Sequence, residues 1–283
     1  MNLNFNKVLP KIRMMMPSLT KTERSIAEHF LNNRSITKET TISQISAELD
    51  VSNALVVKVC KKIGYDGFKE LKTALIVSHC ESRLFTQTLE PTDDCAQIVQ
   101  KVLNNSLGAL QEALSFSSVP SIEQAARVLL GAKRITIMAV GGTSIIAEDF
   151  HHKLLRIGIH TQVPKDYHMM IMSASLMTEE DAVLMISHSG QTVDLLDAAR
   201  EVKKAGAKLI TVTNNFTAEM TQISDLAIFA PASPEPILGK NGTARLIKLA
   251  LIDCLYATIV NMSKEKSISS IKKTMNATAK LHR

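Results

Sequence analysis

Hydroxyl-bearing residues gather in one short stretch in the second half of the chain. Residues 187–192 lie between an apolar run and an amphipathic helical pattern at residues 193–204. Hydroxyls and exposed amides at the start of a helix bind anions through directed donors and the helix dipole, and a glycine lets the backbone approach the ligand. The segment therefore predicts a phosphate-binding loop. Its expected ligand-binding residues are Ser187, His188, Ser189, Gly190, Gln191 and Thr192.

A second polar loop follows the apolar run at residues 135–140. It reads Gly-Gly-Thr-Ser, and we expect Gly142, Thr143 and Ser144 to frame the same ligand, although a tight strand-to-helix connection accounts for this loop equally well. Neither loop is a G-x-x-x-x-G-K-[ST] nucleotide loop or a G-x-G-x-x-G fingerprint. ATP and NAD are thus disfavoured, and we expect no cofactor.

Residues 41–64 carry the pattern of two short helices joined by a tight turn. A capping box begins at Thr41, the turn spans residues 50–52, Ser52 caps the second helix and Gly64 is placed to end it. This unit reads DNA in many proteins. We expect Ser52, Asn53, Ala54 and Lys58 to meet base edges, and Lys61 and Lys62 to meet the phosphate backbone. A small helical domain with an exposed lysine face is the alternative.

The elements around this unit also predict helices. Thr20 and Glu23 form a first capping box, opening a helix that continues to about Asn33. Apolar residues at 68, 71 and 75 share one stripe, which favours a core face. Residues 81–94 lose periodicity and indicate an interdomain linker, followed by helical segments at residues 95–115 and 121–131.

Composition and charge set the class of protein. The 283 residues suffice for two domains, with 45% hydrophobic and 21% charged residues. The net charge of +6 is uneven: residues 1–80 carry 12 basic and 7 acidic side chains, and the tail from residue 264 carries 6 and 1. A basic first segment fits DNA binding, and a solvated helix face explains the tail. Cysteine and histidine spacing predicts no disulfide framework and no metal site. No segment resembles a signal peptide or membrane span, so we expect a cytoplasmic protein.

Apolar runs alternate with amphipathic helices beyond residue 131. The strand candidates are residues 135–140, 160–163, 182–187, 209–213 and 226–230. This alternation predicts a flavodoxin-like α/β domain with a five-stranded parallel sheet and helices on both faces, where ligands bind at the carboxyl ends of the strands. The expected organisation is an all-α helix-turn-helix domain at 1–80, a linker at 81–94 and the α/β domain at 95–283.

These motifs together resemble the RpiR-type bacterial transcriptional regulators over nearly the whole chain. The resemblance rests on Leu19-Thr20, Glu23-Arg24, the segment from Val51-Ser52 to Tyr65, Gly67-Phe68, Glu70-Leu71-Lys72 and the two loops. It implies an N-terminal helix-turn-helix domain and a C-terminal SIS (sugar isomerase) domain that binds a phosphosugar. It also implies that Ser187, Ser189, Gln191 and Thr192 hold the phosphate, with Ser144 beside it, and that Glu235 and Arg245 line the pocket.

Two positions depart from the family pattern in the second helix. Leu55 stands where threonine is usual, and Lys58 stands where arginine is usual. Lysine cannot make the bidentate guanine contact of arginine, so base reading at Lys58 is expected to differ.

The resemblance implies a repressor-type regulator of sugar uptake or catabolism genes that acts as a homodimer or tetramer. Its expected partners are operator DNA and a phosphosugar effector, with no membrane. A sugar-phosphate isomerase or lyase is the competing class, because SIS domains also occur in enzymes. The candidate general base would then be His188, Glu148, Glu235 or a histidine from a dimer partner. A third class is an interaction module with a vestigial pocket. The helix-turn-helix pattern favours the regulator.

Overall fold

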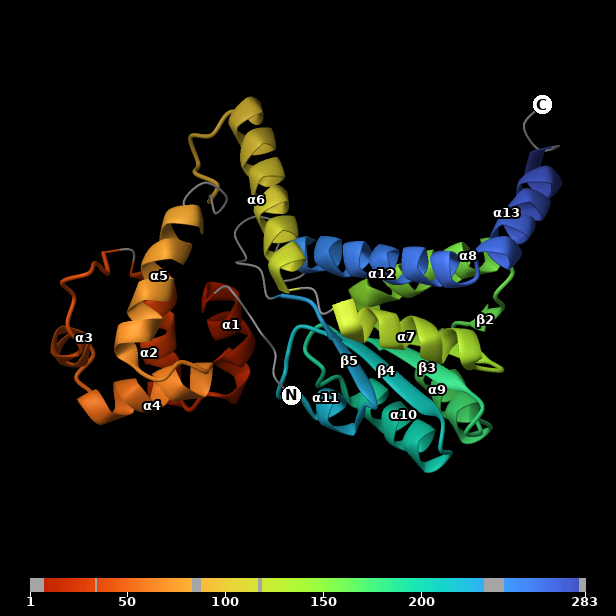
Figure 1. Ribbon diagram of the computed structural model, residues 1–283, viewed down its shortest axis with the longest axis horizontal. Coiled ribbons are helices and arrows are strands. Elements are labelled where there is room, and N and C mark those ends of the chain that lie inside the picture. Colours follow the sequence, from red (N-terminus) through yellow and green to blue (C-terminus); the bar gives the residue numbers. More distant parts are fainter. Residues whose placement is uncertain (1–7, 34, 83–87, 117–118, 232–241, 280–283) are drawn as a thin grey trace. The chain divides into compact units, whose positions relative to one another are not determined.

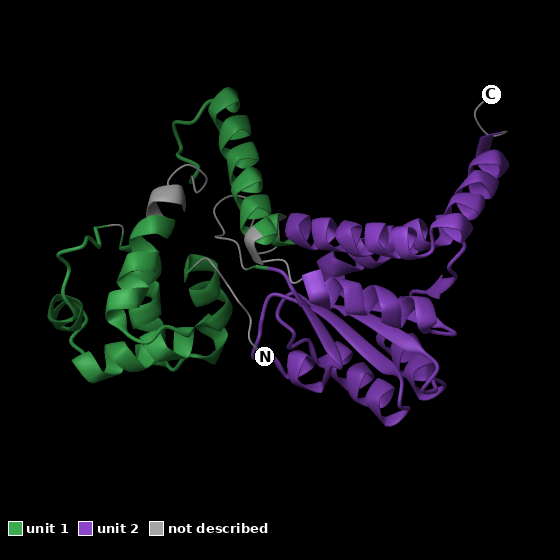
Figure 2. Ribbon diagram, in the orientation of Figure 1, with its two compact units in different colours: residues 1–116, 231–244 green, residues 117–230, 245–283 purple. Residues whose placement is uncertain are grey.

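The computed structural model describes residues 8–33, 35–82, 88–116, 119–231 and 242–279. It divides into two compact units, coloured separately in Figure 2. The first comprises residues 1–116 and 231–244, and the second residues 117–230 and 245–283. The helix at residues 95–116 groups with the first unit by its contacts, whereas the boundary predicted from the sequence assigned it to the second.

The first unit is built of helices. They are α1 (Val8–Met15), η1 (Met16–Ser18), α2 (Lys21–Asn32), α3 (Ile42–Glu48), α4 (Asn53–Ile63), α5 (Phe68–Ser82) and α6 (Cys95–Phe116). Both predicted capping boxes are present, with reciprocal bonds between Thr20 and Glu23 and between Thr41 and Gln44. The Ser52 hydroxyl accepts from the Leu55 amide at 3.2 Å and caps α4. The two-helix unit expected at residues 41–64 is therefore confirmed.

Backbone conformations at two residues shape this unit. Asp50, in the turn between α3 and α4, has a φ of 52°, a left-handed conformation that aspartate tolerates better than most residues. Gly64 has a φ of 90° and ends α4 as predicted. One apolar cluster then holds α1, α2, α4 and α5 together, with Phe30, Ile63 and Leu71 fully buried in it.

The second unit contains a five-stranded parallel sheet. Its strands are β1 (Ile135–Ala139), β2 (Thr161–Gln162), β3 (Ala182–Ile186), β4 (Lys208–Thr213) and β5 (Leu226–Phe229), in the order β2-β1-β3-β4-β5. All four pairings are parallel, so the flavodoxin-like topology is confirmed. The edge strand β2 is shorter than the predicted residues 160–163, because only Thr161 and Gln162 pair with β1.

Helices cover both faces of the sheet (Figure 1). On one side lie α7 (Val119–Gly131), α8 (Ser144–Arg156) and α12 (Gly242–Met262), and on the other α9 (Tyr167–Ser175), α10 (Val193–Lys204) and α11 (Glu219–Ile223). The helix α10 begins and ends at the predicted residues. Because helices cover both faces, every residue of β1, β3 and β5 is buried.

The basic tail forms a helix, α13 (Lys264–Ala279). Its Thr274 hydroxyl lies 3.3 Å from the carbonyl oxygen of Arg156, and its Ser267 is buried. Across the described ranges, no single helix meets the length and hydropathy needed to cross a bilayer; residues 243–262 and 264–279 meet it only as a pair, bent by 108° at the break.

Candidate functional site

The serine-rich loop between β3 and α10 is shaped by its own hydroxyls. The buried Ser187 accepts a hydrogen bond from the Gly190 amide at 3.0 Å. The Ser189 hydroxyl accepts from the Gln191 amide at 3.2 Å and is exposed. Ser187 therefore holds the loop from inside, whereas Ser189 and Gln191 present their side chains to solvent.

Gly190 is required at its position in this loop. Its φ is +64°, and a Cβ atom added there would lie 2.5 Å from the Ala218 Cβ and 3.1 Å from the Thr213 hydroxyl. No larger side chain fits without displacing the chain. The glycine thus brings the loop against the segments that follow β4.

The loop after β1 lies at the same edge of the sheet and uses its hydroxyls internally. It forms a short 3₁₀ turn, η2 (Gly141–Thr143), before α8. The Thr143 hydroxyl lies 2.9 Å from the Val140 carbonyl and 3.0 Å from the Ile186 carbonyl, so it links the ends of β1 and β3. Ser144 donates to the Gly141 carbonyl at 2.6 Å, and Gly142 is exposed. Thr143 and Ser144 consequently fix the frame of the loop.

The two helices that start at these loops have no side-chain caps. Neither Thr143, before α8, nor Thr192, before α10, accepts a hydrogen bond from the first helical turn. By contrast, side chains cap α2, α3, α4 and α9. First-turn amides left without a side-chain cap are available to water or to an anion.

A buried lysine that the sequence reasoning missed lies beside the serine loop. Lys248 of α12 is 1% exposed, and its Nζ lies 3.2 Å from His188 Nδ1 and donates to Asn214 Oδ1. An ammonium group only donates, so when Lys248 is protonated this contact requires His188 Nδ1 to accept and the ring proton to lie on Nε2. Burial lowers the pKa of Lys248 to about 7. Burial, and secondarily the charge of Lys248, lower the pKa of His188 to about 4.

The segment after β4 is a further part of the site that the sequence reasoning left out. The Asn214 amide donates to the His188 carbonyl at 3.2 Å, and Asn215 Nδ2 donates to the Ser189 carbonyl at 3.3 Å. Both asparagines are 6% exposed. Their place in the sequence could have identified them, because both asparagines directly follow β4, the strand that pairs with β3.

Two residues remain of the predicted pocket. Glu235 lies outside the described residues, and Arg245 is exposed in the first turn of α12. Glu148, one candidate general base, is paired with Lys165. Among the described residues, no three histidine, cysteine, aspartate or glutamate side chains cluster as metal ligands would.

The predicted DNA-facing residues of α4 lie on its outer side. Ser52, Asn53, Ala54, Lys58, Lys61 and Lys62 are all exposed, while Val56, Val59 and Ile63 are fully buried. Asn53 Nδ2 lies 3.5 Å from the Ser43 hydroxyl of α3. Lys62 differs from Lys61, because its Nζ lies 2.7 Å from the buried carboxylate of Glu23.

Comparison with known proteins assigns both units. A helix-turn-helix domain of the rpiR family matches residues 6–82, and an SIS domain matches residues 128–258. The HTH-type transcriptional regulator RpiR of Escherichia coli (strain K12) is 34% identical over 94% of this chain and 90% of its own length. The chain belongs to the RpiR family.

Further relatives agree with this assignment. An uncharacterized HTH-type transcriptional regulator of Haemophilus influenzae is 29% identical over 95% of both chains. Among solved structures, the Vibrio vulnificus NanR protein complexed with ManNAc-6P superimposes with a TM-score of 0.62 at 24% identity, covering 97% of this chain and 99% of that one. The protein is thus an RpiR-type transcriptional regulator, and its sheet is that of an SIS domain.

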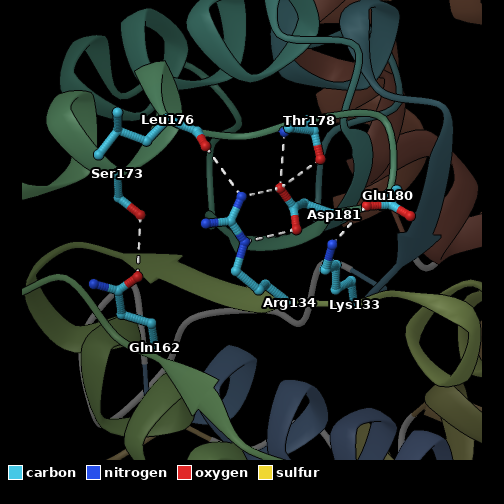
Figure 3. Close-up of polar contacts among 8 residues, drawn as sticks. All are labelled: Lys133, Arg134, Gln162, Ser173, Leu176, Thr178, Glu180 and Asp181. Carbon is cyan, nitrogen blue, oxygen red and sulfur yellow. Dashed lines mark hydrogen bonds and ion pairs between the residues drawn. The ribbon is translucent and has the colours of Figure 1, made fainter.

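A polar cluster braces the opposite, amino end of the SIS sheet (Figure 3). Arg134 and the buried Asp181, which immediately precede β1 and β3, form a bidentate pair at 2.9 and 2.6 Å. Asp181 also accepts from the Thr178 amide at 2.8 Å. The Arg134 bond is the main cause that lowers the pKa of Asp181 to about 2. A cavity of about 210 Å³ adjoins this pair, with Gln162 and Ser173 on its wall.

Proposed function

We propose that this RpiR-family protein binds operator DNA through α4 and that a phosphorylated sugar at the carboxyl edge of the SIS sheet alters its affinity for the operator. The observation that carries the effector site is Lys248, a buried cation beside the serine loop. A phosphosugar dianion bound here interacts favourably with this ammonium group, because little water screens a buried charge.

The surroundings of Lys248 suit a phosphate. The start of α10 lacks a side-chain cap, so its first amides and its dipole are available to phosphate oxygens. The Ser189 and Gln191 side chains are exposed beside it, and Thr192 opens the helix. Within this proposal, Ser187 keeps the loop in shape and its hydroxyl proton remains free for the ligand.

The DNA site is proposed on the exposed side of α4. Its first turn, with Ser52, Asn53 and Ala54, is placed to meet base edges, and Lys58 and Lys61 extend the contact. A homodimer, or each dimer within a tetramer, would present α4 twice to a pseudo-palindromic operator. Coupling between effector and operator is reciprocal and typically about 1–3 kcal/mol.

A solved structure supports the class of effector. NanR is described in complex with ManNAc-6P, a phosphorylated amino sugar, and its fold covers nearly the whole of this chain. We propose by analogy that the protein acts in the cytoplasm and controls genes for uptake or catabolism of the sugar that it senses, without being an enzyme itself.

Fluorescence anisotropy with labelled upstream promoter DNA tests the proposal. The protein is titrated onto the DNA at fixed salt, with and without a panel of sugar phosphates and the matching free sugars. We expect one sugar phosphate to change the affinity and its free sugar to have no effect. If the protein binds no promoter DNA but consumes one of the sugar phosphates, the isomerase or lyase class is correct instead.

Two serine variants make the test specific for the loop. Ser189→Ala should abolish the response to the sugar phosphate while leaving promoter binding intact. Ser175→Ala is the matched control, since Ser175 is also exposed and donates only to the Met172 carbonyl at 2.9 Å among its described contacts. An unchanged response in Ser189→Ala would remove the serine loop from the proposed site.

A further inference from the structure

A carboxylate is buried beneath the proposed DNA-reading helix. Glu23, in the first turn of α2, is 1% exposed. It accepts from the Thr20 amide at 3.0 Å, completing the capping box. Its carboxylate also accepts from Lys62 Nζ of α4 at 2.7 Å. The Lys62 bond is the main cause that lowers the pKa of Glu23 to about 2, so the side chain is ionised at neutral pH.

The same carboxylate holds a second lysine of α4 more loosely. Lys58 Nζ lies 3.5 Å from Glu23 Oε1, and the Lys58 side chain is 64% exposed. Lys58 and Lys62 are four residues apart and therefore adjacent on the helix surface. The Lys62 side chain is only 36% exposed. Its ammonium group thus points back into the domain, whereas that of Lys58 remains largely in solvent.

Lys61 provides the contrast. It is exposed in the same helical turn, and the structure shows no ion pair or side-chain hydrogen bond for it within the described ranges. The three lysines of α4 therefore have three different electrostatic settings, although the sequence pattern treats them as one basic face.

We infer that Glu23 is a positioning residue for DNA reading, which ties α4 to α2 through Lys62 and leaves Lys58 and Lys61 to contact DNA. This rests on the proposed role of α4 and changes the expected role of Lys62 from a phosphate contact to an internal tether. Fixing the second half of α4 against α2 also fixes the angle at which its first turn meets base edges. Positioning of this kind sets sequence discrimination rather than overall affinity.

Replacement of the charge alone tests the inference. In Glu23→Gln the capping box survives, since glutamine serves in it as glutamate does. The freed Lys62 becomes available to phosphates, so the slope of log affinity against log salt should steepen by about one unit. The ratio of promoter to random-DNA affinity should fall by about tenfold, because α4 loses its tether.

A matched control separates positioning from net charge. Glu28→Gln removes the same charge from an exposed position on the same helix. It should strengthen binding to promoter and random DNA alike and leave their ratio unchanged. If Glu23→Gln folds normally and behaves as Glu28→Gln does, the positioning role is refuted.

Lysine variants cover the case in which Glu23→Gln fails to fold. Lys62→Met leaves the buried carboxylate without its main partner and should lower the urea midpoint of unfolding, and adding Glu23→Gln should restore it. Lys61→Ala should keep the midpoint and reduce the salt slope by about one unit. If Lys62→Met keeps the midpoint and reduces the slope as Lys61→Ala does, Lys62 contacts DNA and the inference is wrong. If Lys61→Ala leaves DNA binding unchanged, the proposed role of α4 fails instead.

Discussion

Replacing Gly190 by alanine adds only one methyl group but should strongly destabilise the serine loop. The added methyl group would lie 2.5 Å from the Ala218 Cβ, well inside the contact distance of about 3.5–4.0 Å between carbon atoms. Its partner there is a Cβ, fixed to the backbone, so a rotamer change cannot relieve the overlap. The φ of +64° adds the left-handed penalty that glycine avoids.

The expected magnitude follows from these two effects. A left-handed conformation costs an alanine about 1–2 kcal/mol. Overpacking of a well-filled site costs about 1–3 kcal/mol. The free energy of unfolding should thus fall by roughly 2–5 kcal/mol, a large part of the roughly 5–15 kcal/mol that holds a typical domain. If the loop changes conformation to relieve the overlap, the free energy of unfolding falls less and the protein binds the effector more weakly.

Urea unfolding followed by circular dichroism measures the change, with titration of the sugar phosphate on the same variant. Gly131→Ala is the control, because it lies outside the proposed ligand site, nothing is found within 4 Å of a Cβ built there and its φ is not positive. Its unfolding free energy should change by no more than about 0.5 kcal/mol. If Gly190→Ala matches Gly131→Ala in both assays, the loop is not packed against Ala218 and our account of its shape is refuted.

Three further predictions concern charge. Binding of a phosphate near Lys248 should raise the pKa of that lysine above about 7, so at about pH 8 the complex takes up protons; calorimetry in two buffers of different ionisation enthalpy detects this, and Lys248→Met should abolish it. Without ligand, the unfolded chain binds more protons than the folded one between pH 7 and 10.5, so the contribution of Lys248 to stability rises with pH across that window, as a comparison of urea midpoints with Lys248→Met would show. The pKa of Asp181 is lowered from 3.8 to about 2, so its contribution to the free energy of unfolding is present above pH 4 and is lost as the pH falls toward 2. Arg134→Met should lower the free energy of unfolding at pH 7, and adding Asp181→Asn should restore part of that loss.

Local chemistry allowed most of the fold to be predicted. The Thr20 and Thr41 capping boxes, the Ser52 cap and the Gly64 terminus depend on side chains within four residues of the backbone that they bond, so the sequence displays them directly. The strands were predictable for a similar reason, since a buried parallel strand needs a continuous apolar run. The sequence placed the serine loop correctly between β3 and α10 on the same grounds.

The rest of the site depends on contacts between distant residues. Lys248 lies in an apolar helix 60 residues after His188, and no local pattern distinguishes its buried ammonium from a solvated one. Lys62 and Glu23 are 39 residues apart, so the sequence showed an exposed lysine face where the structure has a tether. The inward turn of the Ser187 hydroxyl also had no sequence signal, because it depends on the positive φ of Gly190.

The buried charges of Glu23 and Lys248 have different proposed roles in regulation. In the helix-turn-helix unit, Glu23 already pairs with Lys62 and accepts from the Thr20 amide, so within our inference α4 is held in place before DNA arrives. In the SIS unit, burial disfavours the charge of Lys248, and within our proposal the phosphate of the effector stabilises that charge. A ligand shifts an equilibrium only by its differential affinity for the two states. We expect the proposed phosphosugar to bind more tightly to the state in which the loops around Lys248 bring its phosphate to the ammonium group. This difference in affinity would shift the equilibrium toward that state. A Lys248→Met variant should therefore still bind the promoter, since the Glu23 tether is intact, and should no longer respond to the sugar phosphate.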